Sequence, residues 1–276
     1  MTDTGNWFPG HMAKALRQLK SDLGQIHGVV EVLDARAPQA TRNPQLEQLF
    51  PDIPHIMALC KAALADNKRL NQAVDILKKE GKVPIPITNK KGLKGLKPLF
   101  DICQNECIVQ KKLEGFVYTQ KVVIVGIPNV GKSSIINAIR GGQAARTGNK
   151  PGVTRHLKWI DVAKNLAFCD SPGILWPKIT TDEQRYQLAA LNCIKEERMP
   201  RHELAGFILE FLQNNYPDAL QKRYNLGDPR LDVTDLFNDI GKERGFYLQG
   251  ETLDEQRLYT HIITDFQSGA FGKISF

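Results

Sequence analysis

Apolar residues follow two different patterns along the chain. In the first 178 residues, short runs rich in β-branched residues alternate with stretches in which apolar residues lie three and four positions apart. The runs that predict strands are 29–34, 55–59, 83–87, 122–125 and 165–170, and helical patterns cover 12–23, 44–50, 70–80, 94–108 and 135–140. Strands that alternate with helices are typical of a mostly parallel, doubly wound α/β sheet.

From residue 181 onward only the helical pattern remains. Apolar residues recur at helical spacing in 188–194 and 204–212, and further helices are expected at 233–244 and 253–266. We therefore predict an α/β domain over residues 1–178 and a separate, small all-helical domain over 179–276. The end of the chain, 268–276, is expected to be a loose tail.

A phosphate-binding pattern follows the strand-like run 122–125. It reads Gly-x-x-x-x-Gly-Lys-Ser and ends at Ser133, and a helical stretch comes next, which is the context that a P-loop requires. Its backbone N–H groups and the helix N-terminus favour phosphate oxygens. The residues expected to contact phosphates are Asn129, Val130, Gly131, Lys132, Ser133 and Ser134. Lys132 is expected to reach the β- and γ-phosphates, and Ser133 to ligate Mg²⁺.

Two later features narrow the class of P-loop protein. Thr154 lies in a long basic loop over 141–158, where its hydroxyl is expected on Mg²⁺ and its backbone near the γ-phosphate. Asp170 is expected to hold Mg²⁺ through water, and Gly173 to offer its N–H to the γ-phosphate. A P-loop, then Thr, then Asp-x-x-Gly is the switch arrangement of regulatory GTPases, which hydrolyse GTP to GDP and phosphate.

The net charge of +7 is concentrated around these motifs. Residues 121–178 hold 9 Lys and Arg against 2 Asp and Glu, whereas 179–276 hold 11 against 16. No acidic residue occurs in 126–160. Part of this charge serves a triphosphate. The rest either meets nucleic-acid phosphates or forms a solvated basic surface, and composition leaves both open.

Composition also bears on the compartment. No apolar run reaches the length of a membrane span, and the N-terminus lacks the features of a signal peptide, so no membrane partner is expected. Five cysteines without framework spacing favour a reducing, cytoplasmic location. Cys103 and Cys107 share a helix face and are expected in the core rather than on a metal.

With these motifs in this order, the chain is similar to the circularly permuted GTPases of ribosome assembly, the YlqF/RbgA family. The similarity covers nearly the whole chain and rests on segments 7–12, 34–38, 126–134, 151–154 and 170–173. It implies a GTPase fold in which the base-recognition segments precede the P-loop. It also implies a monomeric factor that binds the large ribosomal subunit and its rRNA in the GTP state, with hydrolysis that is slow unless the ribosome stimulates it.

The same resemblance places guanine recognition on two segments that precede the P-loop. Their residues are Cys60, Lys61, Ala63, Thr88 and Asn89. The family's Asn-Lys-x-Asp is Cys-Lys-Ala-Ala here, so the loop-bracing amide and the carboxylate that accepts from guanine are both replaced. Each lost charge-assisted hydrogen bond costs about 1.5–3 kcal/mol. Lys61 can still pack on the base, whereas Asp66 lies three residues too far along the chain. We therefore expect weakened and less selective guanine binding.

Catalysis also departs from the common pattern. Ile174 occupies the position after Asp-x-x-Gly where many GTPases have a water-orienting Gln, which predicts slow intrinsic hydrolysis. The resemblance implies His11 as the water-positioning residue, although its sequence context also fits a structural histidine. Asn129 lies where potassium-activated GTPases hold K⁺, so K⁺ is a candidate second ion beside Mg²⁺.

Two other functions stay open at this point. A metabolic phosphotransferase would need an acceptor pocket and a lid with arginines, neither of which the sequence specifies. A nucleotide-binding module that no longer hydrolyses GTP would explain the altered base segment. Intact Lys132, Ser133, Thr154 and Asp170 argue against it, because all four serve a magnesium-bound triphosphate.

Overall fold

The computed structural model describes residue 21 and residues 23–88, 92–107, 119–140, 159–163, 165–170, 179–194, 199–250 and 252–276. The chain divides into two compact units, which are Met1–Ile179 with Ser275 and Thr180–Ile274 with Phe276.

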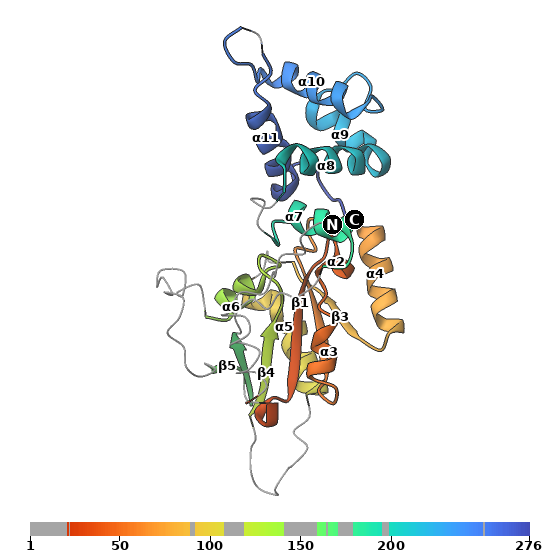
Figure 1. The fold of residues 1–276 in the computed structure, drawn as a ribbon. Coiled ribbons are helices and arrows are strands. Elements are labelled where there is room, and N and C mark those ends of the chain that lie inside the picture. The colour runs from red at the N-terminus through yellow and green to blue at the C-terminus, as the bar shows by residue number, and fades with distance from the viewer. Residues whose placement is uncertain are drawn as a thin grey trace, which may run out of the picture. The chain divides into compact units, whose positions relative to one another are not determined.

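The first unit is built on one six-stranded sheet in the order β3-β2-β1-β4-β6-β5 (Figure 1). Its strands are β1 (Gly28–Asp34), β2 (His55–Cys60), β3 (Val83–Pro86), β4 (Gln120–Val125), β5 (Trp159–Ala163) and β6 (Leu166–Asp170). Neighbouring strands are parallel except for β5 and β6, which are antiparallel. The predicted fold class is thus confirmed. The sequence patterns did not predict β5, because its described side chains are only half-buried or exposed and it lacks a continuous apolar run.

Helices cover both faces of this sheet. They are the short 3₁₀ helix η1 (Leu23–Gln25), α2 (Pro38–Thr41), α3 (Gln45–Leu49), α4 (Asn67–Lys79), α5 (Leu93–Glu106) and α6 (Lys132–Ile139). On one face, strand residues pack with Leu46 of α3 and with Leu77 of α4. On the other face, Phe168 of β6 meets Phe100 of α5 edge-on, with ring centroids 5.6 Å apart. All seven residues of β1 are buried, as expected for a central strand between two helix layers.

The two cysteines near the end of α5 belong to this core. Cys103 and Cys107 are both fully buried, which confirms the sequence prediction. A Cβ built on Gly28, the first residue of β1, would lie 2.1 Å from the Cys107 Sγ. The close approach of α5 to the start of β1 therefore requires glycine at position 28.

The second unit is all-helical, and α8 is in contact with its four other helices. The helices are α7 (Asp182–Ala190), α8 (Arg201–Asn215), α9 (Pro217–Tyr224), α10 (Val233–Arg244) and α11 (Glu255–Ser268). Helix α9 was not predicted, although proline at its first position is a helix-start signal. No helix in the described ranges of either unit is long and apolar enough to cross a bilayer.

The expectation of a loose C-terminal tail is wrong. Phe271 packs against Tyr224 with centroids 5.6 Å apart, and Phe276 lies 4.4 Å from the ring of Phe211. Ile274 is 1% exposed. The large apolar side chains at these positions bury themselves in the helical core, and this outweighs the flexibility of the nearby glycines.

Candidate functional site

The parallel strands bring the predicted motifs to one edge of the sheet. Asp34 ends β1 and pairs in register with Cys60, which ends β2. Strand β4 runs beside β1 and leads into the P-loop, and Ile124 of β4 pairs with Asp170 at the end of β6. Ligand sites in open α/β sheets lie at such carboxyl ends, beside the point where the strand order reverses. Here the strands run from β1 through β2 to β3 at one edge of the sheet. The chain then returns to β4, which lies on the other side of β1, so the strand order reverses between β1 and β4.

The P-loop backbone adopts conformations that favour glycine. Gly126 has φ +154°, and a Cβ there would lie 2.6 Å from the Val32 carbonyl oxygen. Gly131 has φ +117° and directly precedes α6. Asn129 between them has φ 62° and is exposed, whereas Val130 is buried. The loop is thus held close against β1, with its polar residue facing solvent.

Helix α6 begins directly after the loop. Within the described chain, no side chain caps its N-terminus, and Ser134 N and Ile135 N bond back to the Gly131 carbonyl oxygen. Lys132 is half-buried, while Ser133 and Ser134 are exposed in the first turn. This arrangement places a cation and two hydroxyls at a helix N-terminus, which is the combination that phosphate groups favour.

The first base segment lies directly against the P-loop. A Cβ built on Gly131 would lie 2.9 Å from the Cβ and 3.2 Å from the Sγ of Cys60. Cys60 is fully buried, and its burial, together with the nearby charge of Asp34, raises the pKa of the thiol to about 12. The thiol is therefore neutral at physiological pH and fills the space between β2 and the P-loop.

A buried charge cluster supports the contact between Cys60 and the P-loop. The Asp34 carboxylate accepts from Arg36 Nε at 3.0 Å, from Arg36 Nη2 at 2.9 Å and from Lys61 Nζ at 2.8 Å. Burial alone would raise the pKa of Asp34, but the hydrogen bonds and positive charges of Arg36 and Lys61 outweigh burial and lower it. The carboxylate stays ionised and ties Lys61, which has φ 60°, to the end of β1. Parallel register between β1 and β2 creates this pair, and sequence spacing did not reveal it.

The two base segments meet at the ends of β2 and β3. Ala62 N donates to the Ile87 carbonyl oxygen at 3.2 Å, and Ile87 N donates to the Leu59 carbonyl oxygen at 2.8 Å. Ala63 is half-buried, and Thr88 is exposed directly after Ile87. The structure therefore brings residues 60–63 and Thr88 together at one place beside the P-loop.

Asp66 does not replace the missing carboxylate of the base segment. It is the N-cap of α4, and its Oδ1 accepts from Arg69 N at 2.8 Å. A capping aspartate stabilises the helix start by about 1 kcal/mol. Moving this carboxylate toward a base would forfeit that cap.

A second buried carboxylate, Glu31, is a feature that motif reasoning missed. It lies three residues before Asp34 on β1, on the opposite face of the sheet, and accepts from Asn43 N at 2.6 Å. Its other oxygen is buried without a hydrogen-bond partner among the described residues. Burial raises the pKa of Glu31 to about 7, against weaker lowering by the Asn43 hydrogen bond and by Arg42.

Several predicted site residues lie outside the described residues. These are His11, Asn89, Thr154 and Gly173, together with the side chain of Asp170. The Asp170 backbone is described and ends β6 beside β4.

The fold and the site define a P-loop GTPase of circularly permuted order, because the strands that carry the base segments precede the phosphate loop. The chain is 36% identical to ribosome biogenesis GTPase A of Bacillus cereus, in an alignment that covers 98% of this chain and 92% of the relative. It is 38% identical to ribosome biogenesis GTPase A of Bacillus licheniformis, with 98% of this chain and 96% of the relative covered. It belongs to the ribosome biogenesis GTPase A family, as the sequence motifs predicted.

Two further comparisons agree with this assignment. Residues 121–221 match the family model described as a 50S ribosome-binding GTPase. The solved structure of GNP-bound YlqF from T. maritima superimposes with a TM-score of 0.68 at 27% identity, covering 95% of this chain and 97% of that one. The predicted GTPase activity is thus supported, and neither a metabolic phosphotransferase nor a non-hydrolysing module is favoured.

Proposed function

We propose that this GTPase binds magnesium-GTP at the Gly126–Ser133 loop and acts in the cytoplasm as a monomeric assembly factor for the large ribosomal subunit. The observation that carries the proposal is the meeting of the P-loop and the base segments at one sheet edge, where a Cβ on Gly131 would lie 2.9 Å from the Cβ of Cys60. Membership of the family supplies the ribosomal context.

The proposed phosphate contacts follow the loop and helix α6. Lys132 neutralises the β- and γ-phosphates. The remaining contacts come from backbone N–H groups in the P-loop, in the first turn of α6 and in the Asp-x-x-Gly segment over 170–173. Those residues are Asn129, Val130, Gly131, Ser133, Ser134 and Gly173.

Magnesium fits the oxygen donors around the loop. Ser133 is exposed in the first turn of α6, and the Asp170 backbone ends β6, which pairs with the strand that leads into the P-loop. Hydroxyl and carboxylate oxygens are the donors that Mg²⁺ prefers, and Thr154 would add a third. When bound, Mg²⁺ neutralises charge on the transferred phosphate. We also propose K⁺ beside Asn129 as a second ion.

The switch that we propose links the γ-phosphate to the basic segment 141–158 through Thr154. With GTP bound, this segment takes the form that binds rRNA on the large subunit, and hydrolysis ends that state. Because Ile174 lacks a polar group, hydrolysis is slow without the ribosome. We propose His11 as the residue that positions water in the stimulated reaction.

Base recognition rests on fewer polar groups than in the family pattern. Lys61 packs its stem on the base, and backbone groups at Thr88 and Asn89 contact guanine, while Cys60 and Ala63 contribute no hydrogen bond. Weak guanine selectivity is the consequence that we propose.

Co-sedimentation tests the ribosomal role. Purified large and small subunits are mixed with the chain in the presence of GDP, a non-hydrolysable GTP analogue or no nucleotide. We expect the chain to pellet with large subunits chiefly with the analogue, and Lys132→Ala to abolish the difference. Equal pelleting in all three nucleotide states, or equal binding to both subunits, would refute the proposed switch.

Phosphate release tests the catalytic role separately. We expect large subunits to accelerate hydrolysis, and His11→Ala to remove most of the acceleration while leaving the basal rate and nucleotide affinity unchanged. A stimulated rate that survives this substitution would exclude His11 as the water-positioning residue. Replacing K⁺ by Na⁺ in the same assay tests the second ion.

A further inference from the structure

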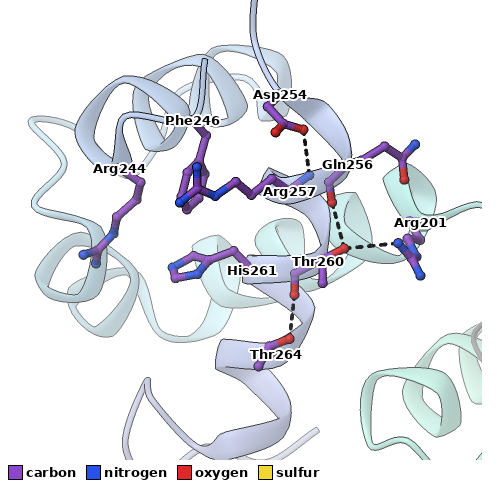
Figure 2. Close-up of a pocket in the computed structure, with 9 residues that line it drawn as sticks. All are labelled: Arg201, Arg244, Phe246, Asp254, Gln256, Arg257, Thr260, His261 and Thr264. Atoms are coloured by element: carbon purple, nitrogen blue, oxygen red, sulfur yellow. Dashed lines mark hydrogen bonds between the residues drawn. The ribbon is translucent and has the colours of Figure 1, made fainter. Parts of the chain in front are cut away.

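Arg36 is a buried arginine that lies two residues beyond the end of β1. It is 2% exposed and belongs to the largest fully buried side chains of the described chain. Two arginines of the helical unit show the more common placement, because Arg201 and Arg257 are both exposed and Arg201 donates to the Thr260 hydroxyl at 3.2 Å (Figure 2). Burying a guanidinium is unfavourable unless its charge and its donors are satisfied. Arg36 therefore needs a partner that offsets the cost of its burial.

That partner is Asp34, and its bonds with Arg36 fix the orientation of the carboxylate. Asp34 Oδ1 accepts from Arg36 N at 3.1 Å and from Arg36 Nε at 3.0 Å, while Oδ2 accepts from Arg36 Nη2 at 2.9 Å. The Asp34 N–H donates to the Thr41 hydroxyl at 3.1 Å, so the backbone of this residue is held as well. A carboxylate has about four acceptor positions, and the bonds from Arg36 leave one of them, on Oδ2.

The remaining position on Oδ2 accepts from Lys61 Nζ at 2.8 Å. In the cluster of Asp34, Arg36 and Lys61, the lysine side chain is the accessible one, at 24% exposed against 0% and 2%. Its backbone has φ 60°, and Leu64 N bonds back to its carbonyl oxygen at 2.8 Å. A free lysine side chain has high rotamer freedom. Here the turn fixes the backbone of Lys61, and Asp34 fixes its ammonium group.

This cluster lies where the first base segment meets the P-loop. Ala35 N donates to the Cys60 carbonyl oxygen at 2.8 Å, which joins the chain beyond β1 to the end of β2. Cys60 packs against Gly131, and its thiol replaces the amide that braces this loop in the family pattern. The charge cluster therefore braces the base segment directly beside the position where the usual amide is missing.

We propose that Asp34 and Arg36 are positioning residues for nucleotide binding, which hold the stem of Lys61 as a preformed support for the base. Arg36 sets the orientation of the Asp34 carboxylate, and the carboxylate sets the position of the Lys61 ammonium. Binding a base then costs less conformational entropy, because the lysine is already ordered. Packing on an aliphatic stem does not distinguish guanine from adenine, so the support contributes affinity for GDP and ADP alike. The inference rests on the proposed function, in which residues 60–63 hold the base.

The test compares ligands with and without a base. Competition against a fluorescent nucleotide, in the presence of Mg²⁺, measures the affinities of the full chain for GDP, ADP and inorganic pyrophosphate. Pyrophosphate offers the P-loop its phosphates but has no base, so the ratio of GDP affinity to pyrophosphate affinity isolates the contribution of the base. The variants are Asp34→Asn, Lys61→Met and the two combined. Methionine keeps an unbranched apolar side chain but cannot donate to Asp34. Arg201→Gln removes an exposed arginine of the helical unit and is the control.

We expect each single variant to lower the ratio roughly three- to tenfold, because immobilising one flexible side chain changes affinity by about that factor. ADP should follow GDP. The double variant should bind GDP no more weakly, relative to pyrophosphate, than Lys61→Met does, because Asp34 acts through the lysine. The two single variants change the charge in opposite directions, so a purely electrostatic effect on the phosphates would be opposite in sign and would cancel in the ratio. Arg201→Gln should resemble the unaltered chain.

The outcomes separate positioning from a merely structural role. An unchanged ratio in Lys61→Met overturns the proposal, including the case in which GDP and pyrophosphate affinities fall together. A further loss when Asp34→Asn is added to Lys61→Met also overturns it, because Asp34 would then act by another route. If Asp34→Asn fails to fold, since Arg36 then keeps a buried charge without its partner, Lys61→Met still decides at its partly exposed position. If the unaltered chain binds neither GDP nor pyrophosphate, the proposed function itself fails, whereas binding of both with an unchanged ratio refutes only the positioning role.

Discussion

The missing carboxylate at position 63 gives the sharpest prediction for this chain. Ala63 lies in a turn whose backbone is fixed by hydrogen bonds from Leu64 N to the Lys61 carbonyl oxygen at 2.8 Å and from Ala65 N to the Ala62 carbonyl oxygen at 3.4 Å. Neither bond involves the side chain of residue 63, which is half-exposed. Ala63→Asp should therefore leave the loop in place and add a carboxylate beside the base.

The magnitude follows from the hydrogen bonds that such a carboxylate accepts. Hydrogen bonds to charged groups contribute about 1.5–3 kcal/mol each. Taking the lower end for two bonds, because the position is partly open to water, gives about 3 kcal/mol, or a roughly 150-fold gain in GDP affinity. ADP lacks the N1 donor and the exocyclic amine of guanine, so its affinity should change little.

Competition of unlabelled GDP and ADP against a fluorescent nucleotide measures both affinities. The unaltered chain should show similar values for the two, and Ala63→Asp should separate them. Ala63→Asn is the matched control, because it has nearly the same shape without the charge and should give a much smaller gain. Strong preference for GDP in the unaltered chain would show that other groups already select guanine, and equal gains for both nucleotides in Ala63→Asp would show that the base lies elsewhere.

Three further substitutions test the stability of the two units and the nucleotide affinity of the P-loop. Burial raises the pKa of Glu31 from 4.5 to about 7, so the folded state binds the Glu31 proton more tightly than the unfolded state does. The free energy of unfolding should therefore fall by about 3 kcal/mol as pH rises from roughly 4.5 to 7. Glu31→Gln should remove that loss of stability, whereas Asp52→Asn, at an exposed position, should not. Urea unfolding followed by tryptophan fluorescence measures the stability at each pH. If the pH profiles of the unaltered chain and Glu31→Gln run parallel, Glu31 is excluded as the cause. Gly131→Ala forces a side chain into φ +117° and 2.9 Å from the last residue of β2, and GDP affinity should fall roughly tenfold or more in a titration. Asp265→Asn weakens the two hydrogen bonds that the carboxylate accepts from Arg223, at 2.9 and 2.7 Å. The free energy of unfolding should fall by about 1–3 kcal/mol, measured by chemical denaturation followed by circular dichroism. A change below about 0.5 kcal/mol would contradict this expectation.

Sequence patterns predicted the parts of the fold that rest on local signals. The apolar run of β1, which only Glu31 interrupts, predicted a buried strand, and the glycine spacing before Lys132 predicted the P-loop between a strand and a helix. The edge strand β5 and the short helix α9 were missed. The edge strand buries little apolar surface, and the short helix is marked chiefly by the proline at its first position, which does not identify a helix by itself.

Other features depend on contacts that no local pattern contains. The pair between Asp34 and Lys61 joins residues that are 27 positions apart and exists because β1 and β2 are parallel and in register. The burial of Glu31 could not be predicted either, because a charged residue inside an apolar run gives no sign of its partner.

The structure separates two tasks that the usual Asn-Lys-x-Asp motif combines. Position 63 lies in a turn whose backbone hydrogen bonds do not involve its half-exposed side chain, so it should affect selectivity for the base without supporting the loop. Position 60 is fully buried against Gly131, so it affects how closely the base segment packs on the P-loop. Cysteine keeps that packing through a small neutral side chain, whereas Cys60→Asn would have to fit an amide into the same space. Selectivity should therefore be recoverable at position 63 alone, while a change at position 60 should alter the affinity for both nucleotides together.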